Sequence, residues 1–345
     1  MLKPLLLRVI FAFTAVPAGA QGVTHVEVVS APSLRGNLMG DPDERQITVY
    51  LPPGYERESR RRYPVVYLLH GFAADHRAFM RGAYQNLNIR ISMDSLIRFK
   101  GIREMIVVTP SARNFFDGSF YSNSPVTGNW EDFIVRDLVS YMDRKYRTVR
   151  SRRGRGIAGH SMGGFGALRI AMRNPDVFSA VYALSPCCLS TTENRDRSTM
   201  QAWRTALGLS ERSEFAKAGF TPNRYYAEAA MYSPNKSKPP FFVDLPFTLA
   251  GDSIALDSAV AIRWSATPLT LAPAYVAGLR RLTIAFDAGT EDGIRDIPPN
   301  VRRLDSLLTK LGVPHLSELY PGTHGSRIRE RIEKKVMPFF SENLK

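Results

Sequence analysis

The sequence predicts an α/β fold in which a mainly parallel central sheet is flanked by helices. Three observations predict it: short apolar runs recur along the chain, segments with helical spacing alternate with them, and a Gly- and Ser-rich turn joins one run to a helix. Of the 345 residues, 44% are hydrophobic and 23% are charged, which is ordinary for a globular protein. The chain is long for one domain, but an α/β domain with an insertion reaches this length.

The first half of the chain predicts three strands and a helix. Residues 47–51 alternate between polar and apolar side chains and end at a Pro-Pro-Gly turn. Residues 63–69 and 105–110 are almost continuous apolar runs, as expected of strands buried on both faces. Residues 130–142 have helical spacing, with acidic residues in the first turn, where the helix dipole favours them.

The second half continues this alternation around one long interruption. The expected elements are a strand ending at 155–158, a helix over 165–172, a strand over 178–186, a strand over 282–287, a helix over 301–311, a strand over 315–320 and a helix over 328–340. Residues from about 190 to 275 are first polar and then rich in Pro and aromatic side chains. This insertion precedes the strand expected over residues 282–287. We expect it to lie over the carboxyl edge of the sheet and to shape a ligand pocket. The alternative is a decoration that faces solvent.

A G-x-S-x-G pattern lies between the strand that ends near residue 158 and the helix that follows. Ser161 is its central residue, and Gly159 and Gly163 flank it. Glycines allow a strained turn and let neighbouring backbone approach closely. A serine on such a strand-to-helix turn is the nucleophile elbow of the α/β-hydrolase fold, so we predict that fold with Ser161 as the nucleophile.

A serine nucleophile needs a general base, and in this fold the base follows the nucleophile and the acid in the chain. The histidines that precede Ser161, and are thereby excluded, are His25, His70, His76 and His160. Of the other two, His315 begins a predicted strand, whereas His324 lies in a Gly-rich loop between the last strand and the last helix. We therefore predict His324 as the base.

The carboxylate that orients the base should follow the strand over residues 282–287. Asp287, Glu291 and Asp292 are candidates there, and we expect Asp287, at the strand end, to stabilise the loop. The tetrahedral intermediate also needs hydrogen-bond donors. We expect the backbone N–H groups of Met162, directly after the nucleophile, and Phe72, in the loop after residues 63–69, to supply them.

The N-terminus predicts a cleaved export signal over residues 1–20. Two basic residues, Lys3 and Arg8, and no acidic residue precede an apolar core over residues 9–16. Small residues then lead to a cleavage site before Gln21. The core is too short to span a bilayer, so we expect no stable membrane insertion. A buried N-terminal strand or helix is the alternative. The prediction is a secreted or periplasmic protein with a mature domain over residues 21–345.

Charge and cysteine usage narrow the classes of partner. The formal net charge of +14 includes basic clusters at residues 57–62 and 147–155, but neither is interleaved with aromatic residues. We interpret both as solvated and expect no nucleic-acid partner. Cys187 and Cys188 are adjacent, which is closer than disulfide geometry favours, and we interpret them as small apolar residues at a strand end. No metal-ligand spacing occurs in the sequence, and we expect no metal and no cofactor.

Over about residues 40–343, apart from the insertion, the sequence resembles the putative-esterase family of α/β-hydrolases. That family includes S-formylglutathione hydrolases, feruloyl and acetyl xylan esterases, enterochelin esterases and mycobacterial mycolyltransferases. The segments that carry the resemblance are residues 51–55, 67–71, 119–122, 130–133, 159–168, 289–292 and 321–324. The resemblance implies a triad acid three residues after the loop glycine, which is Asp292, with Glu291 as the alternative. It also implies oxyanion donors at Phe72 and Met162.

The sequence therefore predicts a secreted serine carboxylic-ester hydrolase that uses Ser161, His324 and Asp292 through an acyl-enzyme. Its substrate is expected to be a small-molecule or carbohydrate-linked ester, and the oligomeric state is left open. An acyltransferase that moves an acyl group to a carbohydrate hydroxyl is the alternative, since it uses the same triad. A catalytically silent binding protein on this fold is a further alternative, which predicts that a triad member is missing.

Overall fold

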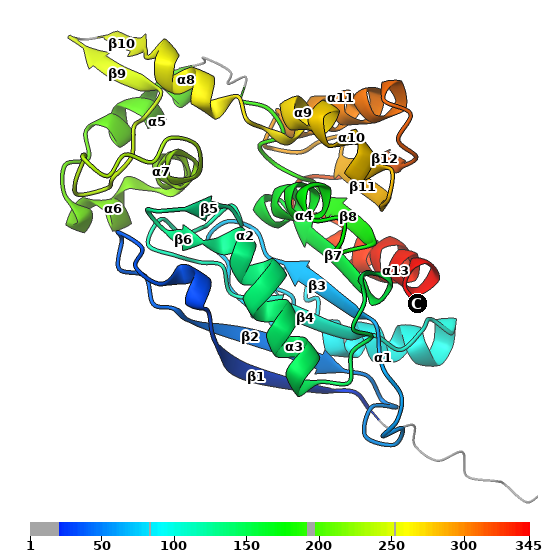
Figure 1. The fold of residues 1–345 in the computed structure, drawn as a ribbon. Coiled ribbons are helices and arrows are strands. Elements are labelled where there is room, and N and C mark those ends of the chain that lie inside the picture. Colours follow the sequence, from blue (N-terminus) through cyan, green and yellow to red (C-terminus); the bar gives the residue numbers. More distant parts are fainter. Residues whose placement is uncertain (1–20, 83, 192–196, 252) are drawn as a thin grey trace, which may run out of the picture.

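A single mixed sheet forms the centre of the molecule, and helices cover both of its faces (Figure 1). The computed structural model describes residues 21–82, 84–191, 197–251 and 253–345, so the predicted signal over residues 1–20 lies outside the described part. The strand order is β1-β2-β4-β3-β7-β8-β11-β12. The bounds of these strands are β1 Val23–Ser30, β2 Glu44–Leu51, β3 Val65–Leu69, β4 Ile106–Pro110, β7 Arg155–His160, β8 Ala180–Leu184, β11 Thr283–Gly289 and β12 Leu316–Tyr320.

The sheet is mainly parallel, as the sequence predicts. β3 pairs in parallel with β4 and β7, and the parallel pairing continues through β8 and β11 to β12. β1 and β2 extend the sheet beyond β4 with antiparallel pairings. Since the carboxyl ends of parallel strands meet at one edge, the loops after β3, β7, β11 and β12 come together there.

Alternate residues of the central strands face two apolar layers. In β3, Val65, Tyr67 and Leu69 belong to one layer, while Val66 and Leu68 belong to the other, and all five are buried. The helices over the first layer are α2 Trp130–Asp132, its π-helical continuation η2 Phe133–Leu138, α3 Val139–Lys145, α4 Met162–Arg173 and α11 Ile297–Lys310. The helices over the second layer are α1 Ile89–Lys100 and the C-terminal run α12 Ile328–Arg331, η5 Ile332–Val336 and α13 Met337–Asn343.

Helix α1 is an element that the sequence analysis did not predict, although its signals are present. The side chain of Asn88 caps the helix by accepting two backbone N–H groups of the first turn. Gly101 ends it in the left-handed conformation, at φ 63°. Ile89, Met93 and Leu96 recur at helical spacing and are buried against the sheet.

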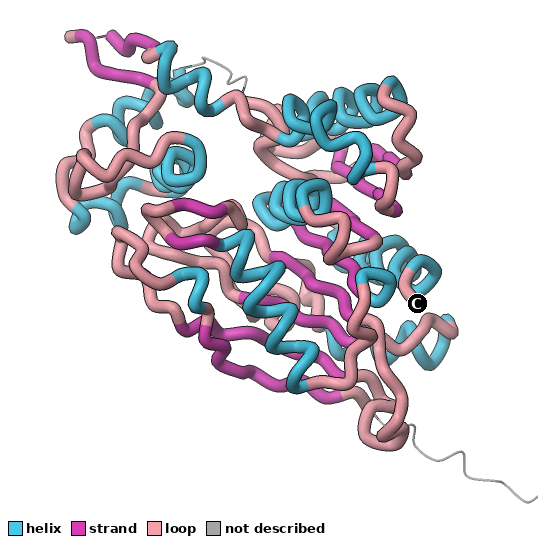
Figure 2. Tube along the Cα trace, in the orientation of Figure 1, coloured by secondary structure: helices cyan, strands magenta, loops and turns pink. Residues whose placement is uncertain are grey.

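The insertion is mostly helical and lies at the top of Figure 1 and Figure 2. Its first part lies beyond one end of the sheet, whereas residues 268–279 pack on α4. Its described elements are α5 Arg197–Leu207, α6 Arg212–Ala218, α7 Phe220–Tyr232, β9 Phe247–Ala250, β10 Ser253–Leu256, α8 Ser258–Trp264, α9 Pro268–Leu271, η4 Ala272–Tyr275 and α10 Val276–Leu279. Helix α7 is held to the segment that follows β4, which includes the short strand β5 Asn123–Ser124. The Ser124 hydroxyl donates to the Ala230 carbonyl oxygen, and the Asn223 amide donates to Asp117 at 3.0 Å.

The two basic clusters differ in their surroundings. Residues 56–60 are exposed, which agrees with a solvated face. In the second cluster Arg155 is buried on β7 and pairs with Asp143 at 2.5 Å, so the interpretation of that cluster as fully solvated is wrong. No helix within the described ranges combines the length and the apolarity needed to cross a membrane.

Candidate active site

The turn between β7 and α4 holds Ser161 in a strained conformation. Its φ is 57° and its ψ is −118°, a region that residues other than glycine rarely adopt. The turn needs glycines because a Cβ at Gly163 would lie 2.2 Å from the carbonyl oxygen of Leu69, and one at Gly159 would lie 2.3 Å from that of Gly163. The elbow is therefore wedged against the end of β3, with the serine hydroxyl at the carboxyl edge of the sheet.

Three side chains from separate loops meet at this edge. Nε2 of His324 lies 2.9 Å from Oγ of Ser161, and Nδ1 of His324 lies 2.8 Å from Oδ2 of Asp292. The Asp292 side chain is fully buried, and its other oxygen accepts the Ile294 N–H at 2.8 Å. A carboxylate at Nδ1 assigns the ring proton to that nitrogen, which leaves the Nε2 lone pair facing the serine hydroxyl.

In the described part of the chain, the residues considered as alternative bases or acids form no hydrogen bond with Ser161 or His324. They make other contacts or face solvent. His315 lies immediately before β12, with ring nitrogens 2.8 Å from the Val313 carbonyl oxygen and 3.1 Å from Asp305. Glu291 is exposed on its loop. Asp287 is buried within β11, which continues to Gly289, and it accepts hydrogen bonds from Tyr182 and Arg331.

Two histidines that the sequence analysis excluded as the base support the loops around Ser161. His160 lies 2.9 Å from the carbonyl oxygen of His324 through Nε2, and burial lowers the pKa of its ring to about 3. His70 lies 2.7 Å from the Gly71 carbonyl oxygen through Nδ1, and its Nε2 accepts the Ala112 N–H. Burial lowers the pKa of His70 to about 4, so both rings are neutral at pH 7.

The two expected oxyanion donors belong to segments that border the nucleophile. Met162 is the first residue of α4, where backbone N–H groups lack partners within the helix. The loop that carries Phe72 passes close to Ser161, since a Cβ at Gly71 would lie 3.5 Å from the Cβ of Ser161. The Phe72 ring is held edge-on against Phe220 of α7, with ring centroids 5.2 Å apart.

Ser161 opens into a cavity of about 420 Å³, which we call the Ser161 cavity. Its lining includes Phe72 and Phe120, whereas Phe220, Arg224 and Tyr225 come from α7 of the insertion. The insertion therefore shapes the space above the nucleophile, as predicted, and is not a solvent-facing decoration. None of these α7 residues is predicted from the sequence, where an aromatic-rich composition is the only local signal.

A second cavity, of about 360 Å³, adjoins the first and has Arg224, Ile294 and Asp296 in common with it. Cys187 lines the Ser161 cavity and Cys188 the second one. Both thiols are free, but the prediction of two merely apolar residues is wrong for Cys188, whose sulfur lies 3.3 Å from Glu228. In the described ranges no group of three or more His, Cys, Asp or Glu side chains is placed to hold a metal ion.

The fold and this site define the protein as an α/β-hydrolase with a serine at the nucleophile elbow. The chain matches the family model described as "Putative esterase" over residues 40–328. It belongs to that family.

Single related proteins share only part of their length or a low sequence identity with this chain. An esterase of Mycobacterium tuberculosis is 36% identical over 137 residues, which are 37% of this chain and 26% of that protein. Among solved structures, a ferulic acid esterase superposes with a TM-score of 0.64 at 22% identity, covering 94% of this chain and 99% of the other. An S-formylglutathione hydrolase from Agrobacterium tumefaciens gives a TM-score of 0.58 at 16% identity, covering 94% and 97%. At these identities the structural likeness shows the shared fold.

Proposed function

We propose that the protein is an exported serine carboxylic-ester hydrolase that works through an acyl-enzyme on Ser161. The observation that carries the proposal is the hydrogen-bonded line from Asp292 through His324 to Ser161. A serine hydroxyl is a weak nucleophile by itself, and an adjacent imidazole oriented by a carboxylate is the usual means of activating it.

In the first half of the reaction, Ser161 Oγ attacks the ester carbonyl while its proton passes to Nε2 of His324. The negative charge that develops on the carbonyl oxygen is stabilised by the backbone N–H groups of Met162 and Phe72. Asp292 stabilises the imidazolium that has formed. As the intermediate collapses, His324 gives the proton to the leaving alcohol oxygen, and the acyl group stays on Ser161.

In the second half, His324 takes a proton from water, and the hydroxide adds to the acyl carbon. Collapse of this second intermediate returns the proton to Ser161 Oγ and releases the carboxylic acid. A sugar hydroxyl in the place of this water would make the reaction an acyl transfer. Product analysis with and without an added sugar acceptor distinguishes the two outcomes.

The test is pre-steady-state hydrolysis of p-nitrophenyl acetate. We expect a burst of p-nitrophenol equal to the enzyme concentration, with no burst in Ser161→Ala. Ser140→Ala, on the exposed face of α3, is the matched control and should keep the burst. A Ser161→Ala variant that still becomes acetylated would contradict the proposal. Methyl ferulate and S-formylglutathione belong in the same substrate panel, because structural neighbours are named for such compounds.

Export has its own support and its own test. The basic residues, apolar core and small residues within residues 1–20 support a cleaved signal. We expect the protein recovered from a bacterial periplasm or culture medium to begin at Gln21, as intact-mass measurement would report. Recovery of the full-length chain from the cytoplasm alone would overturn this part of the proposal.

A further inference from the structure

The sequence contains two cysteines, and the loop after β8 brings both to the edge of the active site. Cys187 lines the Ser161 cavity, and Cys188 lines the second cavity. Both thiols are free, and their sulfur atoms lie 2.9 Å apart. The sulfur atoms of a disulfide are about 2.05 Å apart, so a relative movement of about 0.9 Å would join these two. We call these two residues the thiol pair.

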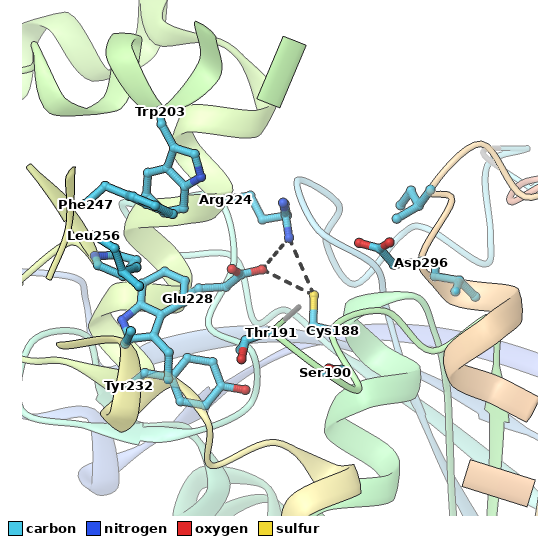
Figure 3. A pocket seen from close by; sticks show the side chains of 15 residues that line it. Cys188, Ser190, Thr191, Trp203, Arg224, Glu228, Tyr232, Phe247, Leu256 and Asp296 are labelled. Atoms are coloured by element: carbon cyan, nitrogen blue, oxygen red, sulfur yellow. Dashed lines mark hydrogen bonds and ion pairs between the residues drawn. The ribbon is translucent and has the colours of Figure 1, made fainter. Parts of the chain in front are cut away.

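The two thiols have different surroundings. Figure 3 shows the Cys188 sulfur pointing toward Arg224 and Glu228 of α7, and it lies 3.3 Å from the Glu228 carboxylate. The hydrogen bond to Cys187, and then burial and the neighbouring Glu228, raise the pKa of Cys188 well above its usual range. Because the thiolate is the reactive form of cysteine, we assign the first reaction of the pair to Cys187.

The loop that carries the thiol pair is packed against the nucleophile elbow. The Cys187 N–H donates to the Ser161 carbonyl oxygen at 3.3 Å. A Cβ at Gly164, in the first turn of α4, would lie 3.1 Å from the Cα of Pro186. A change in the backbone of this loop therefore reaches the residue whose hydroxyl carries the chemistry.

Joining the two sulfurs would change that backbone. Consecutive Cα atoms are about 3.8 Å apart, whereas those of a disulfide are usually about 4.4–6.8 Å apart. A bond between neighbours therefore strains the chain between them, and strained disulfides are the more easily reduced ones. Such a bond would be reversible, which suits a regulatory site better than a structural one.

We propose that the thiol pair is a reversible redox site, in which a disulfide between Cys187 and Cys188 forms by exchange with a small disulfide and lowers the activity of Ser161. The effect on activity rests on the proposed esterase function, whereas formation of the bond does not. Export, which is also proposed, would bring the pair to a compartment where disulfides persist.

The exchange takes place in two steps. The Cys187 thiolate attacks one sulfur of the small disulfide, whose S–S bond breaks and releases the first thiolate. The Cys188 thiol then loses its proton and attacks the Cys187 sulfur of this mixed disulfide, which releases the second thiolate. The protein gives up two electrons and two protons, and the small disulfide leaves as two thiols.

The test treats the mature enzyme with bis(2-hydroxyethyl) disulfide and 2-mercaptoethanol at a series of ratios, followed by desalting. We expect the intact mass to fall by two hydrogen atoms, the titratable thiols to fall from two to none, and no disulfide-linked dimer to form. For p-nitrophenyl acetate, kcat should fall about tenfold to 100-fold, because a misplacement near 1 Å in an active site has this effect. A phosphine reductant should restore it.

Two variants serve as controls, each compared with its own untreated form. Cys188→Ala lacks the second thiol, so it should gain the mass of one mercaptoethanol group and never lose two hydrogens. Cys187→Ala/Cys188→Ala contains no cysteine, and the treatment should leave both its mass and its kcat unchanged. A loss of kcat in this double variant would assign the effect to another group.

Two further results would overturn the inference while leaving the esterase intact. One is a wild-type enzyme that keeps both thiols, or forms only mixed disulfides, at every ratio. The other is an internal disulfide that changes kcat by less than about twofold, well short of the loss expected from a displaced nucleophile. An enzyme inactive before any treatment would instead overturn the proposed function, and the mass measurement would still report on the thiol pair.

Discussion

Replacing Asp292 by Asn should abolish most activity through the tautomer of His324. Asp292 uses one oxygen to accept the Ile294 N–H at 2.8 Å and the other to contact Nδ1 of His324 at 2.8 Å. An Asn that keeps the bond to Ile294 must turn its NH₂ group toward Nδ1. Nδ1 then has to accept, so the ring proton moves to Nε2 and faces the Ser161 hydroxyl, 2.9 Å away. The base has lost the lone pair it needs.

The expected fall in kcat is about 10⁴-fold, the size reported by the same substitution in serine-protease triads, or about 5.4 kcal/mol in the activation barrier. Steady-state hydrolysis of p-nitrophenyl acetate measures it, with Tm as a check on folding. Glu291→Gln is the control, since this neighbouring carboxylate is exposed, and its kcat should stay within about twofold of wild type. A kcat for Asp292→Asn within tenfold of wild type, or a large loss in Glu291→Gln, would refute the assignment of the acid.

Three further predictions concern stability. Arg331→Met leaves Asp287 buried without its cation, and should lower the free energy of unfolding by about 3–5 kcal/mol in urea titrations. An unchanged free energy of unfolding would show that the ion pair is dispensable. Gly163→Ala places a Cβ against a carbonyl oxygen at the end of β3, and should cost about 1–3 kcal/mol together with most of kcat; an active, equally stable variant would contradict the packing described for the elbow. The pKa values of His70 and His160 are lowered to about 4 and about 3, while those of the unfolded chain lie near 6.5, so the unfolded chain takes up protons first as the pH falls. The stability that the neutral rings allow is therefore present above about pH 6.5 and is lost as the pH falls toward about 4. The expected loss in the free energy of unfolding is about 2 kcal/mol per histidine between pH 7 and pH 5, measured by urea titrations. A flat pH profile would show that these rings can be protonated in the folded state.

The sequence could predict what local patterning and chain order determine. Apolar runs such as residues 63–69 mark buried parallel strands, and the order of nucleophile, acid and base points to loops that the strands bring to one edge. The choice between Asp292 and Glu291 could not be made from spacing alone, because both lie on one turn and only the packing buries the first. The ion pair of Asp287 with Arg331 joins residues that lie 44 apart in the chain, and nothing local to either residue signals it.

The contacts around the site also suggest that rate and specificity depend on different parts of the chain. The catalytic loops are held by buried contacts from the sheet side, such as that of His160 with the His324 carbonyl oxygen and those of His70 with Gly71 and Ala112. None of these contacts involves the insertion. The walls that a substrate meets beyond Ser161 come largely from α5, α7, α8 and β9, whose packing is aromatic and internal to the insertion. Substitutions in those elements can therefore change which ester is bound while the geometry of proton transfer is retained, which is why family members with the same triad can differ in substrate.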